Sequence, residues 1–162
     1  MVHEITGDLL KVKQGIICHQ TNYYGVMGGG IAAAIADRIL TAEQYATYSS
    51  YCKQAGRTAL GTVQFLGNVP GLVVANMFCQ DESKPQVDGR YDITDYEAMV
   101  SCLIRIRDLA EAHKLTVHIP HHIGCGIAGG DWNLVRQLIY SIFSESAVDV
   151  FIVAREAANG KA

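Results

Sequence analysis

The sequence has little charge, little proline and no long apolar run. Only 18% of the 162 residues are charged, 3 are proline, 1 is tryptophan, and Lys and Arg form no cluster. With a net charge of −3, the chain offers no basic surface for general nucleic-acid binding or for an anionic membrane. No apolar stretch approaches the ~20 residues that cross a bilayer, and residues 1–5 carry no basic and apolar signal sequence. We therefore expect a cytoplasmic protein without a membrane partner.

The cysteine patterns that indicate disulfides or metal sites are also missing. The five cysteines are scattered through apolar segments without Cys-x-x-Cys spacing, which favours reduced and mostly buried thiols. His118, His121 and His122 stand close together, but zinc needs three or four converging ligands, and no cysteine pair accompanies these histidines. We predict no metal site and no cofactor, and we interpret the histidines as exposed or packed side chains.

The chain does contain an alternation of strand and helix patterns. Apolar and β-branched runs predict strands over residues 3–6, 15–19, 62–66, 72–78, 116–120 and 148–153. Amphipathic spacing and capping signals predict helices over residues 31–39, 41–55, 94–113 and 131–143. Two of these helices begin with capping boxes, Thr41 with Gln44 and Thr94 with Glu97.

This alternation predicts the fold class. Strands interleaved with helices, with one hairpin at residues 67–71, indicate an α/β protein, a three-layer αβα sandwich with a mixed central sheet. The length fits one domain. We expect that domain over residues 1–155, followed by a C-terminal tail over 156–162. A polar loop over 80–93 is long enough to suggest a functional element.

Two glycine-rich loops each follow a predicted strand and open a helix. The first contains Gly28 to Gly30 and the second runs from Gly124 to Gly130. Backbone N–H groups and the positive end of a helix favour an anion there, and the absence of a Cβ allows a ligand to approach closely. The alternative is that these glycines only form turns and caps. No Gly-Lys-Ser/Thr follows, so we expect diphosphate binding without phosphoryl transfer.

Four segments together resemble the macrodomains, the ADP-ribose-binding family. They are Thr6-Gly7-Asp8-Leu9-Leu10, Ile17-Cys-His-Gln-Thr-Asn22, Gly25-Val-Met-Gly-Gly-Gly-Ile-Ala32 and the segment from Ile119 to Trp132. The chain is most similar to bacterial and phage members grouped with the terminal ADP-ribose protein glycohydrolase. Around His19 it also resembles the yeast ADP-ribose 1″-phosphate phosphatase. The resemblance implies a partner: ADP-ribose or an ADP-ribosylated substrate.

The resemblance also implies a role for each motif. Asp8 would accept a hydrogen bond from the adenine amino group, Asn22 would meet the distal ribose, and the two glycine loops would enclose the diphosphate. The implied ligand contacts are Asp8, Leu9, Gln20, Thr21, Asn22, Met27, Gly28, Gly29, Gly30, Ile31, Ile123, Gly124, Cys125, Gly126, Ile127 and Ala128. Carboxylates suit an exocyclic amine and backbone donors suit phosphate oxygens, in agreement with this placement.

Catalysis is the less determined part of the prediction. Glycohydrolases of this group use a lysine and an aspartate, and their places are held here by Gln80 and Ala128. Glutamine cannot form a Schiff base, so the covalent lysine route is not expected. We predict His19 and Asp131 as catalytic candidates. The alternatives are a silent buried histidine and a helix N-cap.

The expected function is hydrolysis of an ADP-ribose adduct at the distal ribose, with the adduct carried on protein or nucleic acid. Two alternatives are a reader that binds ADP-ribose without turnover and an ADP-ribose 1″-phosphate phosphatase. A third, an adaptor that uses the loop over residues 81–93, has little support because no large apolar patch is evident there.

Overall fold

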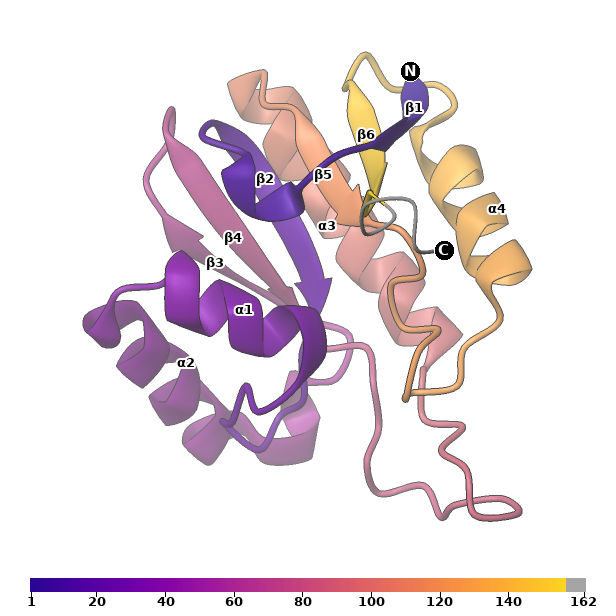
Figure 1. Cartoon of the computed structure of the whole chain (residues 1–162). Helices are drawn as coiled ribbons and strands as arrows, with labels where there is room; N and C mark the ends of the chain where they lie inside the picture. Colours follow the sequence, from indigo (N-terminus) through magenta and orange to yellow (C-terminus); the bar gives the residue numbers. More distant parts are fainter. Residues whose placement is uncertain (157–162) are drawn as a thin grey trace.

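A six-stranded mixed sheet forms the centre of the protein (Figure 1), and the computed structural model describes residues 1–156. In spatial order the strands are β1-β6-β5-β2-β4-β3. Their bounds are β1 Val2–Thr6, β2 Gly15–Gln20, β3 Val63–Gly67, β4 Leu72–Met77, β5 Val117–Pro120 and β6 Val150–Ala154. All neighbouring pairs are parallel except β3 and β4, which form the predicted antiparallel hairpin.

Two helices cover each face of this sheet. Helices α1 (Gly30–Arg38) and α2 (Ala42–Ala55) lie on one face, and α3 (Tyr96–His113) and α4 (Trp132–Phe143) lie on the other (Figure 1). Short 3-10 turns occupy Leu9–Lys11 and Gly56–Ala59. The predicted three-layer sandwich with a mixed central sheet is therefore confirmed.

Alternation along β2 shows how the two cores form. Ile16 and Cys18 are buried against α3 and α4, whereas Ile17 packs with Ile35 of α1 on the opposite face. A strand covered on both faces needs an apolar residue at every position, which explains why this segment is a continuous apolar run. Burial of each isoleucine contributes roughly 1.5–3 kcal/mol to folding.

Local capping was predicted correctly at one helix and wrongly at another. The Thr41–Gln44 capping box is present at α2, with both reciprocal hydrogen bonds. At α3 the N-cap is Asp95, whose carboxylate accepts a hydrogen bond from the Ala98 amide at 2.9 Å. Thr94 instead donates its hydroxyl to the carbonyl of Gly124 at 2.6 Å, so it is not available as a cap.

The remaining chain contains one long connection. Residues 80–93 run between β4 and α3 with only two isolated bridges, Gln80 with Thr94 and Val87 with Arg90. Of the predicted tail over 156–162, all but Glu156 lies outside the described residues. Among residues 1–156, no helix has the length and apolar character required to cross a membrane.

Candidate ligand-binding cleft

The two glycine loops meet at one edge of the sheet. They follow β2 and β5, which are parallel neighbours, so both lie at the carboxyl ends of their strands. Between them is an open cleft of about 1740 Å³. With one exception, Cys125, every ligand-contact residue predicted from the sequence lines this cleft. The sequence motifs therefore converge on one site.

Glycine leaves open space on both sides of the cleft. A Cβ at Gly29 or Gly126 would have no atom within 4 Å, although both residues line the cleft. Gly29 is the N-cap of α1 and offers no side-chain cap, so the first N–H groups of that helix have no acceptor from it. Gly30 has a φ of +57°, a left-handed conformation that favours glycine. An anion is the natural partner for this helix end.

The first loop is held by the side chain of Asn22. Its Nδ2 donates to the Val26 carbonyl at 2.7 Å, and its Oδ1 accepts from the Tyr24 amide at 3.0 Å and the Tyr48 hydroxyl at 2.9 Å. The asparagine, predicted to meet the distal ribose, therefore also fixes the loop that leads to the glycines.

Glycines of the second loop are required mainly by packing. Gly124 has a φ of +70°, and a Cβ there would lie 2.7 Å from Oε1 of Gln20. Gly129 also has a positive φ, and its Cβ would collide with the carbonyl oxygen of Tyr91. The Ile93 amide donates to the carbonyl of Ala128 at 2.9 Å, which ties this loop to the end of the polar loop. At Gly124 and Gly129 the alternative prediction, that these glycines are required by the turn itself, therefore fits the structure.

At the far end of the cleft stands Asp8. Its Oδ1 accepts the Leu10 amide at 2.9 Å as the cap of the first 3-10 turn, and the residue is exposed. Leu9 beside it is buried and helps line the cleft. Lys11 and Arg155 line the same end and place positive charge there. Asp8 thus has a second carboxylate oxygen to offer to a donor on the ligand.

His19 lies beneath the cleft and does not line it. The side chain is fully buried, and its Nε2 is 2.6 Å from Oδ1 of Asn76 on the neighbouring strand β4. Burial lowers the pKa of His19 to about 4, so the ring is neutral at physiological pH. This position favours the alternative of a silent structural histidine over a general base.

Asp131 and Cys125 also lie outside the cleft lining. The Asp131 carboxylate accepts the Asn133 amide at 2.9 Å as the N-cap of α4, and its backbone N–H donates to the Tyr96 hydroxyl at 2.9 Å. The N-cap interpretation of Asp131 is therefore confirmed. The Cys125 thiol donates a hydrogen bond to the carbonyl of Ile123 at 3.2 Å.

A chain of polar side chains enters the cleft from β2 and the polar loop, and it joins the predicted contact Gln20 to Glu82, which sequence reasoning missed. Gln20 Nε2 donates to Gln80 Oε1 at 3.0 Å, and Gln80 Nε2 donates to Glu82 Oε1 at 2.5 Å. All three residues line the cleft. Burial raises the pKa of the Glu82 carboxyl above its usual range. In the sequence, the only signal for Glu82 was its place two residues after the position of the missing lysine.

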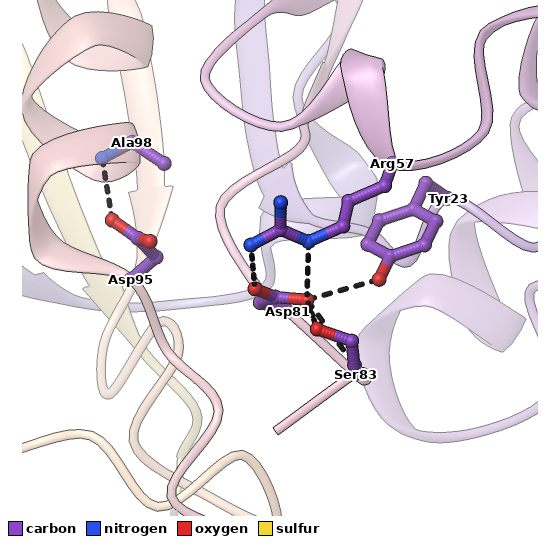
Figure 2. Close-up of polar contacts among 6 residues, drawn as sticks. All are labelled: Tyr23, Arg57, Asp81, Ser83, Asp95 and Ala98. Atoms are coloured by element: carbon purple, nitrogen blue, oxygen red, sulfur yellow. Dashed lines mark hydrogen bonds and ion pairs between the residues drawn. The ribbon is translucent and has the colours of Figure 1, made fainter.

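Asp81, between Gln80 and Glu82, anchors this segment to the rest of the protein. Its carboxylate accepts hydrogen bonds from Arg57 at 2.8 Å, from the Tyr23 hydroxyl at 2.9 Å and from the Ser83 hydroxyl at 2.6 Å (Figure 2). Asp81 is only 2% exposed. Its pKa is held well below the usual range, first by Arg57 and then by its other donors.

The three neighbouring histidines do not gather around a common point. His121 and His122 instead pack against the indole of Trp132, with ring centroids 4.6 and 5.3 Å away. His118 stacks on Phe151. Within residues 1–156, no group of three or more His, Cys, Asp or Glu side chains could hold a metal ion.

Fold and site together define a three-layer α/β domain with an anion-binding cleft at the carboxyl ends of its strands. The model of the Macro domain family matches residues 18–139, and the chain belongs to this family. An ADP-ribose 1″-phosphate phosphatase of Scheffersomyces stipitis is 29% identical over 86% of this chain and 93% of that protein.

Solved structures agree on the architecture. A Bacteroides thetaiotaomicron protein of unknown function is 30% identical with a TM-score of 0.81, covering 95% of this chain and 98% of that one. The macrodomain of Mycobacterium tuberculosis DarG shares the fold at 24% identity and a TM-score of 0.76, covering 97% of this chain and 99% of that one.

Proposed function

We propose that the cleft binds ADP-ribose and that the protein hydrolyses an ADP-ribose adduct at the distal ribose. The observation that carries the binding proposal is the open space at Gly29 and Gly126, on opposite sides of one cleft. A diphosphate there would meet the N-terminus of α1, where backbone donors and the helix dipole favour negative charge.

The ends of the cleft suit the two ends of the ligand. Asp8 keeps one carboxylate oxygen for the exocyclic amine of adenine, a donor that carboxylates accept well. At the opposite end, Asn22, Gln20 and Gln80 offer amide groups to the hydroxyls of a ribose.

Hydrolysis is supported by the relative from S. stipitis, whose name states a reaction at the 1″ position of ADP-ribose. Gln80 excludes a lysine Schiff base, so water is the expected nucleophile. The second candidate function is a reader without turnover. It is favoured by the loss of both glycohydrolase side chains, at Gln80 and Ala128, and by the position of His19 and Asp131 outside the cleft lining.

Calorimetry with ADP-ribose, followed by turnover assays, tests both parts. The turnover substrates are ADP-ribosylated protein, ADP-ribosylated DNA and ADP-ribose 1″-phosphate. Binding with release from at least one substrate supports the full proposal, whereas binding without release from any supports the reader. Absence of ADP-ribose binding refutes both functions.

A further inference from the structure

Glu82 stands at the cleft because of the way the loop is anchored. Glu82 lies in a turn in which the Asp81 carboxylate accepts a hydrogen bond from the Ser83 amide at 3.1 Å. The Asp81 carboxylate is bound by Arg57 and Tyr23 (Figure 2) and does not line the cleft, whereas Gln80 and Glu82 do. The ion pair at Asp81 therefore positions the carboxylate next to it.

One oxygen of Glu82 is held and the other is not. Oε1 accepts the hydrogen bond from Gln80, whereas Oε2 is buried and has no hydrogen-bond partner among residues 1–156. Buried polar atoms in native proteins are nearly always paired, and a carboxylate oxygen without a partner is costly to keep. Because Glu82 also lines the cleft, its carboxylate is a candidate to act on a bound substrate.

The groups around Glu82 locate it within the cleft. Tyr48 of α2 lines the same cleft as Glu82, and its hydroxyl donates to Asn22. Asp81 accepts the Tyr23 hydroxyl at 2.9 Å, and Tyr23 follows Asn22 in the chain, so Glu82 lies at the Asn22 end of the cleft. The adjacent carboxylate of Asp81 is paired with Arg57 at 2.8 Å.

We propose that Glu82 is the general base of the hydrolysis, an inference that rests on the proposed function. Its carboxylate takes a proton from a water molecule while the water oxygen forms a bond to C1″ of the distal ribose. The bond from C1″ to the acceptor atom breaks, and the acceptor leaves with the electron pair. The proton on Glu82 then passes to the acceptor, so that ADP-ribose, the protonated acceptor and the unchanged carboxylate result. A carboxyl with a raised pKa is a stronger base for this step.

The test compares Glu82→Gln with Asp88→Asn. The first change removes the base while keeping the size of the side chain. The second makes the same isosteric change at an exposed residue of the same loop, outside the cleft lining. General-base catalysis contributes about 10²–10⁴-fold, so Glu82→Gln should lower kcat at least 100-fold on whichever of the three ADP-ribosyl substrates the wild type cleaves. The Kd for ADP-ribose should stay within about threefold, and Asp88→Asn should match the wild type.

A pH profile separates catalysis from a structural role. The wild-type kcat should fall at acidic pH with a midpoint above that of an ordinary glutamate, and Glu82→Asp should keep such an acidic limb at a lower rate. Full turnover by Glu82→Gln would overturn the proposal. So would a wild type that binds ADP-ribose but cleaves none of the substrates, although binding would then stand. A wild type that binds no ADP-ribose would refute the proposed function itself.

Discussion

Replacement of Gly29 by valine should abolish ligand binding and leave the fold intact. Gly29 has a φ of −151°, an extended conformation that a β-branched residue adopts readily, and a Cβ there meets no atom within 4 Å. Valine is a poorer N-cap than glycine, which costs about 0.5–1 kcal/mol, but it loses less chain entropy on folding, a gain of about 0.4–1 kcal/mol. The free energy of unfolding should therefore change by less than about 1 kcal/mol.

The effect on affinity should be much larger. The side chain would stand in the space between the N-terminus of α1 and the opposite loop, where the diphosphate is proposed to lie. Hydrogen bonds to a charged partner are worth about 1.5–3 kcal/mol each. The loss of two would weaken binding by about 3–6 kcal/mol, or roughly 100-fold to 10⁴-fold.

Calorimetry with ADP-ribose and urea unfolding of the same preparations measure the two effects separately. Gly126→Val is the matched variant, since Gly126 also has open space at its Cβ and lies on the opposite side of the cleft. Wild-type affinity in a folded Gly29→Val protein would refute the placement of the diphosphate. Loss of the fold would instead contradict the finding that a side chain at Gly29 has open space around its Cβ.

Three further changes test residues around the cleft. His19→Gln should remove a pH dependence of the free energy of unfolding. The pKa of His19 is about 4 in the folded protein against an ordinary 6.5, so the neutral ring stabilises the fold fully above pH 6.5 and less as the pH falls toward 4. Between pH 7.5 and pH 5, urea unfolding should show the wild type losing about 2 kcal/mol more of its free energy of unfolding than the variant loses. Asp81→Asn should lower the free energy of unfolding by about 2–4 kcal/mol at pH 7. The Arg57 side chain is 64% exposed and can return to water, so the loss should lie at the low end of the range for breaking a buried ion pair. An unchanged urea midpoint would contradict that anchor. Asp131→Ala should cost about 1 kcal/mol as a lost N-cap and leave kcat unchanged, so a large fall in kcat would restore its catalytic assignment.

Features that depend on neighbouring residues in the chain were predictable, and features that depend on distant contacts were not. The strand and helix pattern, the Thr41 capping box and the two glycine loops are local signals. The prediction of Thr94 as a helix cap was wrong because its hydroxyl donates a hydrogen bond to the carbonyl of Gly124, thirty residues away. Glu82 was missed for a similar reason. Its polar surroundings in sequence indicate a solvated loop, whereas the fold buries its Oε2 beside the cleft.

The same distant contacts make the cleft largely preformed. Asn22 holds the first loop through its bonds to Val26 and Tyr48, and Thr94 holds the second through Gly124. Loops that are already fixed lose little conformational entropy when a ligand binds, so more of the interaction energy appears as affinity. The proposed binding thus uses backbone held by the fold, whereas the proposed turnover uses Glu82, in a short segment anchored by Asp81. Replacement of Glu82 by glutamine should therefore lower kcat while leaving the Kd for ADP-ribose nearly constant.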